Sequence, residues 1–528
     1  MLLTLQTLIL LLTVMAVVAA VARRVQIPPA ILLVLAGLVL AFIPGLPAIQ
    51  LAPQLMLLVV LPPVVYWSGV TMSWREFRAN LRPISLLAVG CVTFTTVATA
   101  LCAHAFLGFP WAVAFVLGAI VSPPDEVAPL AIARRLRLPA RIQVILEGEG
   151  LANDATSLVL YRFAIAAVGA GTFSFAQASA EFVAIVVGEI VWGIGVGWAM
   201  LHLRHRARDP NVEILLSVLT PFIAYWPPQF LGGSGVLAAV SAGLYVSWNG
   251  PYLIGSATRL QGIFFWGFLN YLIEGMVFLV TGLQARALIA RMNALPPGAL
   301  LVATAVVCAS VVVARFIWVF PSTYLPRLLV RREPAPSWRA VFVIGFTGIR
   351  GLVSLAIALA IPLTTQSGKP FPYRDEILLL TFAVILVTLV GQGMTLPWII
   401  RALGLENSDE HERRQERAQE RAARHGAIEA ALATLARLEE QSKLSHDFFA
   451  RLRARYGDHR RELEYRGLVE STIERYDEIE DRLIRAERDT VNALYRQNRL
   501  SDESRRRLEH ELNLREAQLS KLREADGP

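Results

Sequence analysis

The chain has 528 residues, of which 55% are hydrophobic and 17% are charged, and its mean hydropathy is +0.50. These proportions exclude a water-soluble protein of several ordinary domains and indicate a membrane protein. The net charge of +8 does not indicate nucleic-acid binding, because residues 401–528 hold 26 Lys and Arg against 28 Asp and Glu. The positive surplus belongs to the apolar region, so we expect no nucleic-acid partner.

The sequence divides into two regions that suit different solvents. Charged residues make up 38 of the first 400 positions and 54 of the last 128. We therefore predict a transmembrane domain at residues 1–403 and a C-terminal helical cytoplasmic domain at residues 404–528. The three cysteines lie in apolar runs without paired spacing, so they predict neither a disulfide framework nor a zinc site, and we expect no cofactor.

Runs of about 20 apolar residues predict thirteen transmembrane helices. In chain order they lie at 2–22, 27–44, 52–70, 84–107, 111–133, 142–169, 178–203, 211–230, 232–248, 260–285, 298–320, 338–363 and 375–400. When alternate loops are assigned to opposite sides, seventeen arginines fall on one side and four basic residues on the other. The positive-inside rule then predicts a multi-pass protein of the cell (inner) membrane, with its N-terminus outside and its tail in the cytoplasm.

Charged residues inside the expected spans are the candidates for function, because a charge at the bilayer centre costs about 2.5–3.5 kcal/mol on insertion scales. Eight acids and three arginines have such places: Asp125, Glu126, Glu147, Glu149, Asp154, Glu181, Glu189, Glu274, Arg162, Arg315 and Arg350. The excess of acids indicates a cation or proton pathway rather than a set of static salt bridges.

Two neighbouring spans carry the strongest signals. In the span at 111–133, prolines precede Asp125 and Glu126 and interrupt the helix, which frees carbonyl oxygens that suit a hard cation. The alternative is a simple kink whose acids face an arginine. In the span at 142–169, Asp154 follows Glu149 and Asn153, which share one helix face. A carboxyl group in such a place can hold a proton and release it to a cation, although Glu149 and Asn153 also suit a polar helix interface.

Four stretches together resemble the monovalent cation/proton antiporter family, which includes bacterial sodium/proton antiporters and animal sodium/proton exchangers. SPPDEVAP at 122–129 resembles the family's Thr-Asp-Pro-Val-Ala crossing motif, and EGEGLANDAT at 147–156 resembles Glu-Ser-Leu-x-Asn-Asp. GIRG at 348–351 resembles Gly-x-Arg-Gly, and GGSGVLAAVSAGL at 232–244 is also similar. The resemblance implies an all-α membrane protein of about 13 helices with inverted repeats and two broken crossing helices. It also implies a homodimer in membrane lipid and the electroneutral Asn-Asp branch.

The resemblance implies a role for each matching residue. Asp154 would bind the cation and exchange the proton, with Asn153 beside it and Asp125 as a second cation ligand at the helix crossing. Glu149 would pair with Arg350 and bond Asn153, which would hold the site in shape.

The chain departs from the family pattern at three positions. Pro124 stands in place of the usual Thr, Glu126 follows Asp125, and Gly150 stands where Ser is common. Glu126 would replace a lost ligand oxygen, add a second titrating group or face the cytoplasmic funnel.

Other charged residues of the spans receive weaker assignments. Glu274 would line the outer cavity or pair with Arg315. Arg162 is assigned a structural role, and Glu181 and Glu189 are assigned to an interface or the surface.

The sequence therefore predicts a secondary transporter, not an enzyme, that exchanges a monovalent cation for H⁺ one for one at Asp154 and serves pH and cation homeostasis. Na⁺ is favoured, with Li⁺ and K⁺ as alternatives. The competing interpretations are an exchanger that prefers K⁺, an organic-ion transporter, and a cation sensor or channel that signals through the tail.

The charged tail predicts helices at 408–443, 461–499 and 502–524, with Ser501 as the N-cap of the last. We expect a solvated helical domain, with a regulatory or dimer-contacting role as the alternative.

Overall fold

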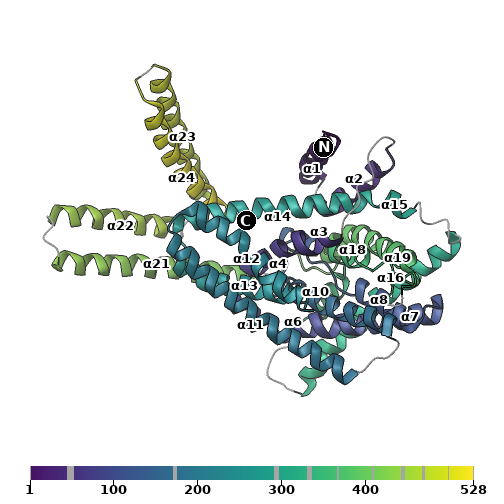
Figure 1. The fold of residues 1–528 in the computed structure, drawn as a ribbon. Helices are drawn as coiled ribbons and strands as arrows, with labels where there is room; N and C mark the ends of the chain where they lie inside the picture. The colour runs from purple at the N-terminus through teal and green to yellow at the C-terminus, as the bar shows by residue number, and fades with distance from the viewer. Residues whose placement is uncertain are drawn as a thin grey trace. The chain divides into compact units, whose positions relative to one another are not determined.

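The structure, a computed structural model, describes residues 2–25, 27–43, 53–170, 175–289, 297–329, 336–365, 368–406, 410–441, 446–466, 470–497 and 499–526. These residues form helices and their connections, with one isolated bridge between Thr364 and Pro370 and no β-strand. The chain divides into two units, Met1–Asp409 and Glu410–Pro528 (Figure 1). Each unit is described by itself below.

The first unit contains α-helices and short π-helical segments (η). They are α1 (Leu2–Val25), α2 (Pro29–Ala41), α3 (Pro53–Leu55), η1 (Met56–Val60), α4 (Leu61–Thr71), α5 (Trp74–Ala79), α6 (Leu81–Ser85), η2 (Leu86–Cys91), α7 (Val92–Leu107), α8 (Trp111–Val121), α9 (Val127–Arg135), α10 (Ala140–Ala170), α11 (Phe175–Ala207), α12 (Pro210–Phe230), α13 (Val236–Leu253), α14 (Ser256–Leu283), α15 (Ala285–Ile289), α16 (Pro297–Leu329), α17 (Trp338–Phe346), α18 (Leu352–Leu359), α19 (Arg374–Leu386), η4 (Val387–Gln392) and α20 (Gly393–Ala402).

Six continuous helical stretches in the described residues are long and apolar enough to cross a membrane. They are Leu81–Leu107, Ala140–Val168, Ser179–Ala207, Ser256–Leu283, Gly298–Leu325 and Arg374–Ala402. The remaining apolar helices are shorter: Gln6–Ala22, Pro29–Ala41, Met56–Thr71 and Trp111–Val121. The first unit is therefore an all-helical membrane domain built from long and short apolar helices.

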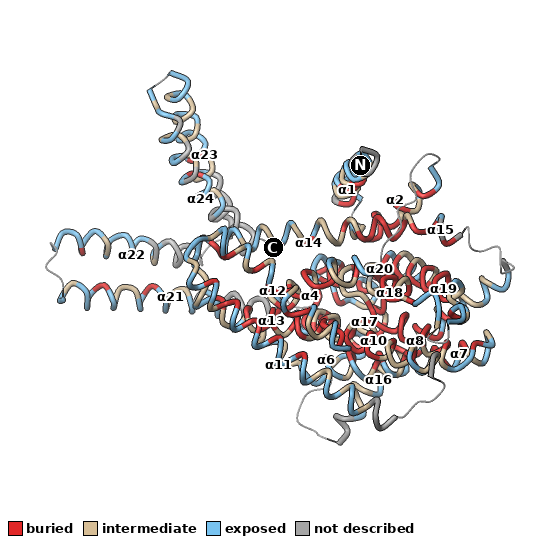
Figure 2. Tube along the Cα trace, viewed as in Figure 1, coloured by how far each residue is buried: buried red, intermediate tan, exposed pale blue. Residues whose placement is uncertain are grey.

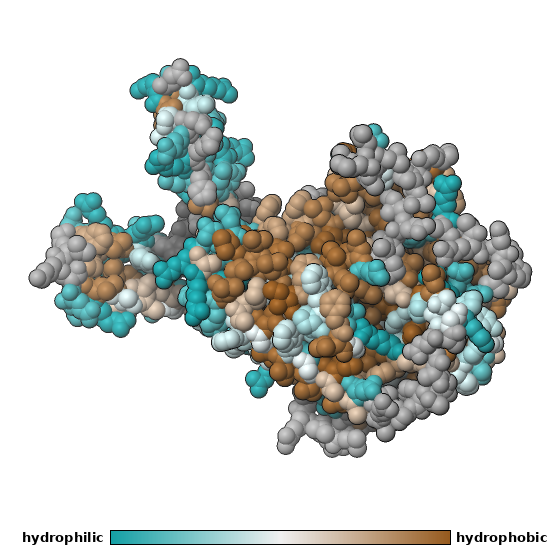
Figure 3. All heavy atoms as spheres, in the orientation of Figure 1, coloured by the Kyte–Doolittle hydropathy of each residue, from teal (hydrophilic) through white to brown (hydrophobic). Residues whose placement is uncertain are grey.

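The outer face of α11 shows why this unit requires an apolar solvent. Val183, Val187, Val191, Ile194 and Trp198 lie three or four residues apart, and all are exposed. Only 22% of the most apolar stretch of this helix is buried within the chain. Figure 3 shows apolar side chains over much of the visible face of the first unit. Such a surface is stable when lipid or a second subunit covers it.

The helices of the first unit approach closely through glycines. A Cβ atom on Gly37 of α2 would overlap the backbone of α14, where Gly282 lies, and one on Gly243 of α13 would overlap the backbone of α4. Small residues at such crossings let helices pack where no hydrophobic effect drives them together. Figure 2 shows buried residues gathered around α8, α10, α18 and α19.

Glu189 of α11 corrects one prediction from the sequence. It is 2% exposed, so it does not lie on the surface, and it lies instead where α11 packs against α13. Its carboxylate accepts hydrogen bonds from the backbone N–H groups of Ser234, Gly235 and Leu237 and from the Ser234 hydroxyl. The first N–H groups of a helix have no partner within that helix, so a buried acid is stable there. Glu189 therefore ties α11 to the start of α13.

The second unit contains two helical hairpins. They are formed by α21 (Glu410–Gln441) with α22 (His446–Arg466), and by α23 (Glu470–Arg496) with α24 (Asp502–Asp526). Glu439 contacts His446 at 2.6 Å and also pairs with Arg453 across the first hairpin. In the second hairpin, Arg488 contacts Glu516 at 2.5 Å. Most residues of these helices are exposed, as expected for a solvated domain.

The tail confirms one sequence prediction, the N-cap of its last helix. The Ser501 hydroxyl accepts a hydrogen bond from the backbone N–H of Ser504 at 3.2 Å, so Ser501 is the predicted N-cap. The helix predicted at 461–499 covers the end of α22, up to Arg466, and α23, from Glu470, and residues 467–469 between them lie outside the described residues.

Candidate functional site

Two helices of the first unit are interrupted, and the interruptions face each other. The first separates α8 from α9 at residues 122–126, as the prolines predict, and the second separates α17 from α18 at residues 347–351. The backbone N–H of Asp125 donates to the carbonyl oxygen of Ile349 at 2.6 Å. Pro123 and Pro124 have no N–H to donate, which weakens a continuous helix and favours the first interruption.

Each interruption supplies a charged side chain to the other. The carboxyl group of Asp125 lies so close to Gly351, at the start of α18, that a Cβ atom there would overlap it. Arg350 donates from Nε to the carbonyl of Val121 at 2.8 Å and from Nη2 to that of Ser122 at 3.3 Å, where α8 ends. An acid at a helix start and a cation at a helix end are both stabilised by the helix dipole. The two charges therefore hold the crossing together.

Asn153 links α10 to the first interruption. Its Nδ2 donates to the carbonyl oxygen of Pro124 at 2.7 Å, so one of the carbonyls freed by the break is satisfied. Asn153 is fully buried, and its Oδ1 has no hydrogen-bond partner in the part of the chain that the structure describes. A buried acceptor without a partner is rare in proteins and often marks a place where a ligand or water binds. Asn153 also lines the cavity described next.

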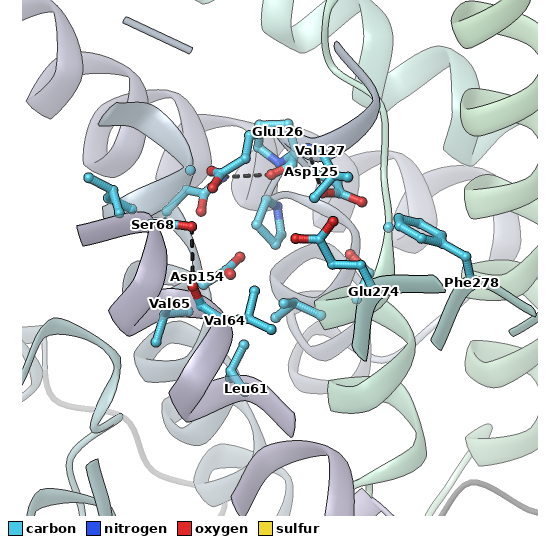
Figure 4. A pocket seen from close by; sticks show the side chains of 18 residues that line it. Leu61, Val64, Val65, Ser68, Asp125, Glu126, Val127, Asp154, Glu274 and Phe278 are labelled. Carbon is cyan, nitrogen blue, oxygen red and sulfur yellow. Dashed lines mark hydrogen bonds between the residues drawn. The ribbon is translucent and has the colours of Figure 1, made fainter. Parts of the chain in front are cut away.

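A small cavity of about 60 Å³ lies beside the crossing and is lined by four carboxylic acids. Asp125 and Glu126 come from the first interruption, Asp154 comes from α10 and Glu274 comes from α14 (Figure 4). Figure 4 shows Asp154 and Glu274 directed into the cavity from opposite sides. A cavity of this size has room for several water molecules or for a partly hydrated ion.

These four acids have no basic partner within 4.0 Å among the described residues, where the ion pairs of the first unit involve other acids. One carboxylate oxygen of Asp125 accepts from the Val127 N–H at 3.1 Å, and the other is buried without a partner. No three acidic, His or Cys side chains in the described ranges converge as a metal site. The acids around the cavity are therefore not already arranged as a metal site, although all four line it.

Glu149 corrects the pairing implied by the family resemblance. Its partner is Arg315 of α16, not Arg350, with Nη1 at 2.5 Å and Nη2 at 2.7 Å from the two carboxylate oxygens. The guanidinium of Arg350 is already bonded to backbone carbonyls, including that of Gly348. Asn153 bonds Pro124 instead of Glu149. Glu149 and Arg315 thus form a separate buried pair beside the site.

Glu274 lines the same cavity as Asp154 rather than pairing with Arg315, because Arg315 is bonded to Glu149. Two hydroxyl groups that the sequence analysis did not single out also lie here. Ser354 of α18 lines the cavity and has a buried Oγ without a partner among the described residues. Ser68 of α4 also lines the cavity. Isolated serines are common in apolar spans, so only the position of Ser354 three residues after Gly351 could have drawn attention to it.

Comparisons with known proteins agree with this arrangement. The model of the family described as "Sodium/hydrogen exchanger, transmembrane" matches residues 9–402. The chain is 34% identical to an uncharacterised Na⁺/H⁺ exchanger of Mycobacterium tuberculosis, over 96% of each protein. It is 32% identical to a sodium, potassium, lithium and rubidium/H⁺ antiporter of Bacillus pumilus, over 74% of this chain and 61% of that protein.

A solved structure has the same fold. The sodium/proton antiporter MjNhaP1 of Methanocaldococcus jannaschii superposes with a TM-score of 0.60 at 18% identity, over 76% of this chain and 98% of that one. The family match confirms the prediction of a transporter rather than an enzyme. The chain belongs to the sodium/hydrogen exchanger family and is a membrane cation/proton exchanger.

Proposed function

We propose that this protein exchanges Na⁺ for H⁺ by alternating access, with Asp154 as the group that binds either the cation or the proton. The observation that carries the proposal is the set of unpaired acids around one cavity beside two interrupted helices. Acids without basic partners are costly inside a membrane domain unless they bind a cation or a proton. Asp154 is on a continuous helix, α10, whereas Asp125 is on the interruption itself, so the two acids approach the ion from different elements.

Asp125 and Asn153 complete the proposed ion site. The second carboxylate oxygen of Asp125 and the amide oxygen of Asn153 are both buried and unbonded within the described residues, so each is available as a ligand. Pro124 supports the site by accepting the hydrogen bond that orients Asn153. The pair of Glu149 with Arg315 and the backbone bonds of Arg350 would hold the surrounding helices without titrating in each cycle.

The stoichiometry follows if Asp154 alone alternates between the two ions. Each half-cycle then moves one positive charge on the same carboxylate, so exchange is one for one and electroneutral. We infer that the exchanger serves pH and cation homeostasis. Titration of Glu126 or Asp125 in every cycle would instead move two protons per cation and make transport electrogenic.

We also propose the architecture that the resemblance implies. The membrane domain would have thirteen spans, in which α8–α9 and α17–α18 are counterparts in inverted repeats. The N-terminus would lie outside and the helical domain after residue 403 in the cytoplasm, where it would have a regulatory role. The exposed apolar face of α11 supports burial in lipid or at the contact of a homodimer.

A second candidate is an exchanger that prefers K⁺. The Bacillus pumilus relative is named for sodium, potassium, lithium and rubidium, which favours a site that accepts several cations. The test is H⁺ movement in proteoliposomes of the purified full chain, measured with a pH-sensitive dye after addition of Na⁺, Li⁺ or K⁺. Exchange predicts that a cation added outside enters the proteoliposomes and drives H⁺ out of them. Cation flux that continues without counterflow of H⁺ would instead identify a channel.

A further inference from the structure

In the cavity wall, the side chain of Glu126 occupies the space that a side chain on Gly150 would need. Glu126 follows Asp125 in the first interruption, and Gly150 lies on α10 four residues before Asp154. A Cβ atom on Gly150 would overlap the carboxyl group of Glu126 and lie 3.0 Å from the Glu126 Cβ. The Glu126 side chain therefore fills the volume that any side chain at position 150 would need.

This contact directs the Glu126 carboxyl group to the face of α10 that carries the exchanging acid. Residues four apart lie above one another on a helix, so Gly150 and Asp154 share that face. Both residues and Glu126 line the same cavity, and Figure 4 shows Glu126 and Asp154 there. Because Gly150 has no side chain, the Glu126 side chain has room to lie on the same side of α10 as Asp154.

The surroundings of Glu126 provide no protein cation for it. The charged groups that act on it most strongly from the described residues are acidic: Asp154, Asp125, Glu147 and Glu274. It has no ion pair within 4.0 Å in the described ranges. A purely structural buried acid is normally paired or hydrogen-bonded, as Glu149 and Glu189 are here.

We propose that Glu126 is a ligand of the transported cation and that Gly150 gives it access to the site, so that this pair of residues sets the affinity and selectivity for the cation. The inference rests on the function proposed above and adds an oxygen ligand to Asp154, Asp125 and Asn153. Carboxylate oxygens are the ligands that hard cations prefer, and the number of charged ligands tunes cation affinity.

The test compares apparent KM values for Na⁺, Li⁺ and K⁺ in proteoliposomes of the full-length protein. We expect Glu126→Ala to raise the KM for the preferred cation roughly tenfold, as for loss of one ligand-shell group, with exchange still measurable at saturation. Gly150→Ala displaces the same carboxyl group, so it should raise the KM in the wild-type background but have little further effect together with Glu126→Ala. Glu126→Ala with Gly150→Ser brings a hydroxyl oxygen into the same volume and should recover part of the loss.

The matched control is Glu147→Ala, since Glu147 is also on α10 but pairs with Arg134 at 3.3 Å outside the cavity lining. The KM of this variant should stay much closer to the wild-type value than that of Glu126→Ala. Monodisperse elution in detergent verifies folding, and Glu126→Gln, of nearly the same size, replaces any alanine variant that does not fold and should change the order of cation preference.

An unchanged KM and an unchanged order of preference in the folded Glu126 variants would overturn the inference. Additive effects of Gly150→Ala and Glu126→Ala would also overturn it, because the two residues would then act independently. Failure of the proposed function looks different: the wild-type protein itself would show no exchange with any of the cations.

Discussion

Arg315 donates from both terminal nitrogens to the two carboxylate oxygens of Glu149, at 2.5 and 2.7 Å, and each side chain is only 2% exposed. The guanidinium also donates from Nε to the carbonyl oxygen of Ile344, at 3.1 Å. This fork joins α10, which carries Asp154, to α16 and to α17, just before the second interruption. This ion pair thus joins the helices around the site without lining the ion cavity.

Removing one member of this pair should destabilise the protein strongly. Arg315→Met leaves the Glu149 carboxylate buried and unpaired, which typically costs about 3–5 kcal/mol. We expect a marked fall in the thermal midpoint in detergent, and recovery of much of it in the double variant Arg315→Met with Glu149→Gln. Arg134→Met is the control, because Arg134 is 59% exposed in its pair with Glu147, and such pairs contribute about 0–1 kcal/mol. Equal midpoints for the two single variants would contradict this role.

Arg350 should be required for transport in a way that lysine cannot satisfy. Its planar guanidinium bonds the carbonyls of Val121, Ser122 and Gly348 at once, whereas a lysine ammonium on a flexible chain cannot match this geometry. Loss of one or two charged hydrogen bonds predicts that Arg350→Lys slows exchange roughly tenfold or more. The measurement is the initial rate of H⁺ flux. Arg339→Lys on the exposed part of α17 should keep the wild-type rate, and an active Arg350→Lys would exclude the proposed role.

The dependence on pH should have the sign of direct competition. A proton on Asp154 prevents cation binding, so the apparent KM for the cation should rise as the pH falls, by up to about tenfold per pH unit. The maximal rate at saturating cation should change much less. This is measured in proteoliposomes with the same pH on both sides before the cation is added. A KM that stays constant while the maximal rate falls would show that the proton acts elsewhere than at the cation site.

Membrane potential should not drive the exchange. If one cation crosses for one proton, the final cation gradient balances the pH gradient at any potential. If one net charge moved per cycle, 100 mV would contribute about 2.3 kcal/mol, which is roughly a fiftyfold gradient. We expect no shift of the balance point when a K⁺ diffusion potential is imposed with valinomycin, provided that the exchanged cation is Na⁺ or Li⁺. A fiftyfold shift would establish a second titrating acid, for which Glu126 is the first candidate.

The parts of the fold that depend on local chemistry could be predicted from the sequence. Pro123 and Pro124 lack N–H groups, and the interruption at 122–126 is where they and the adjacent acids Asp125 and Glu126 predict it. Ser501 acts as an N-cap because its hydroxyl reaches the next turn of its own helix. The apolar composition likewise indicates the membrane domain wherever helices are long and continuous.

The parts that depend on helix packing could not be predicted. Either Arg315 or Arg350 can satisfy Glu149 chemically, and the choice depends on how α16 and α17 lie against α10. The burial of Glu189 could not be predicted, because its hydrogen-bond partners at the start of α13 are distant in the sequence. The contact of Glu126 with Gly150 joins two helices, and no periodicity within either one reveals it.

The most direct test of exchange at Asp154 is the collapse of an imposed pH gradient in everted membrane vesicles on addition of Na⁺, Li⁺ or K⁺. The wild-type protein and Asp154→Asn are compared at equal amounts in the membrane, with Glu147→Gln as the control on the same helix. We predict that at least one cation dissipates the gradient with the wild type and with Glu147→Gln, and that none does so with Asp154→Asn. Undiminished exchange by Asp154→Asn would contradict the proposed role of Asp154.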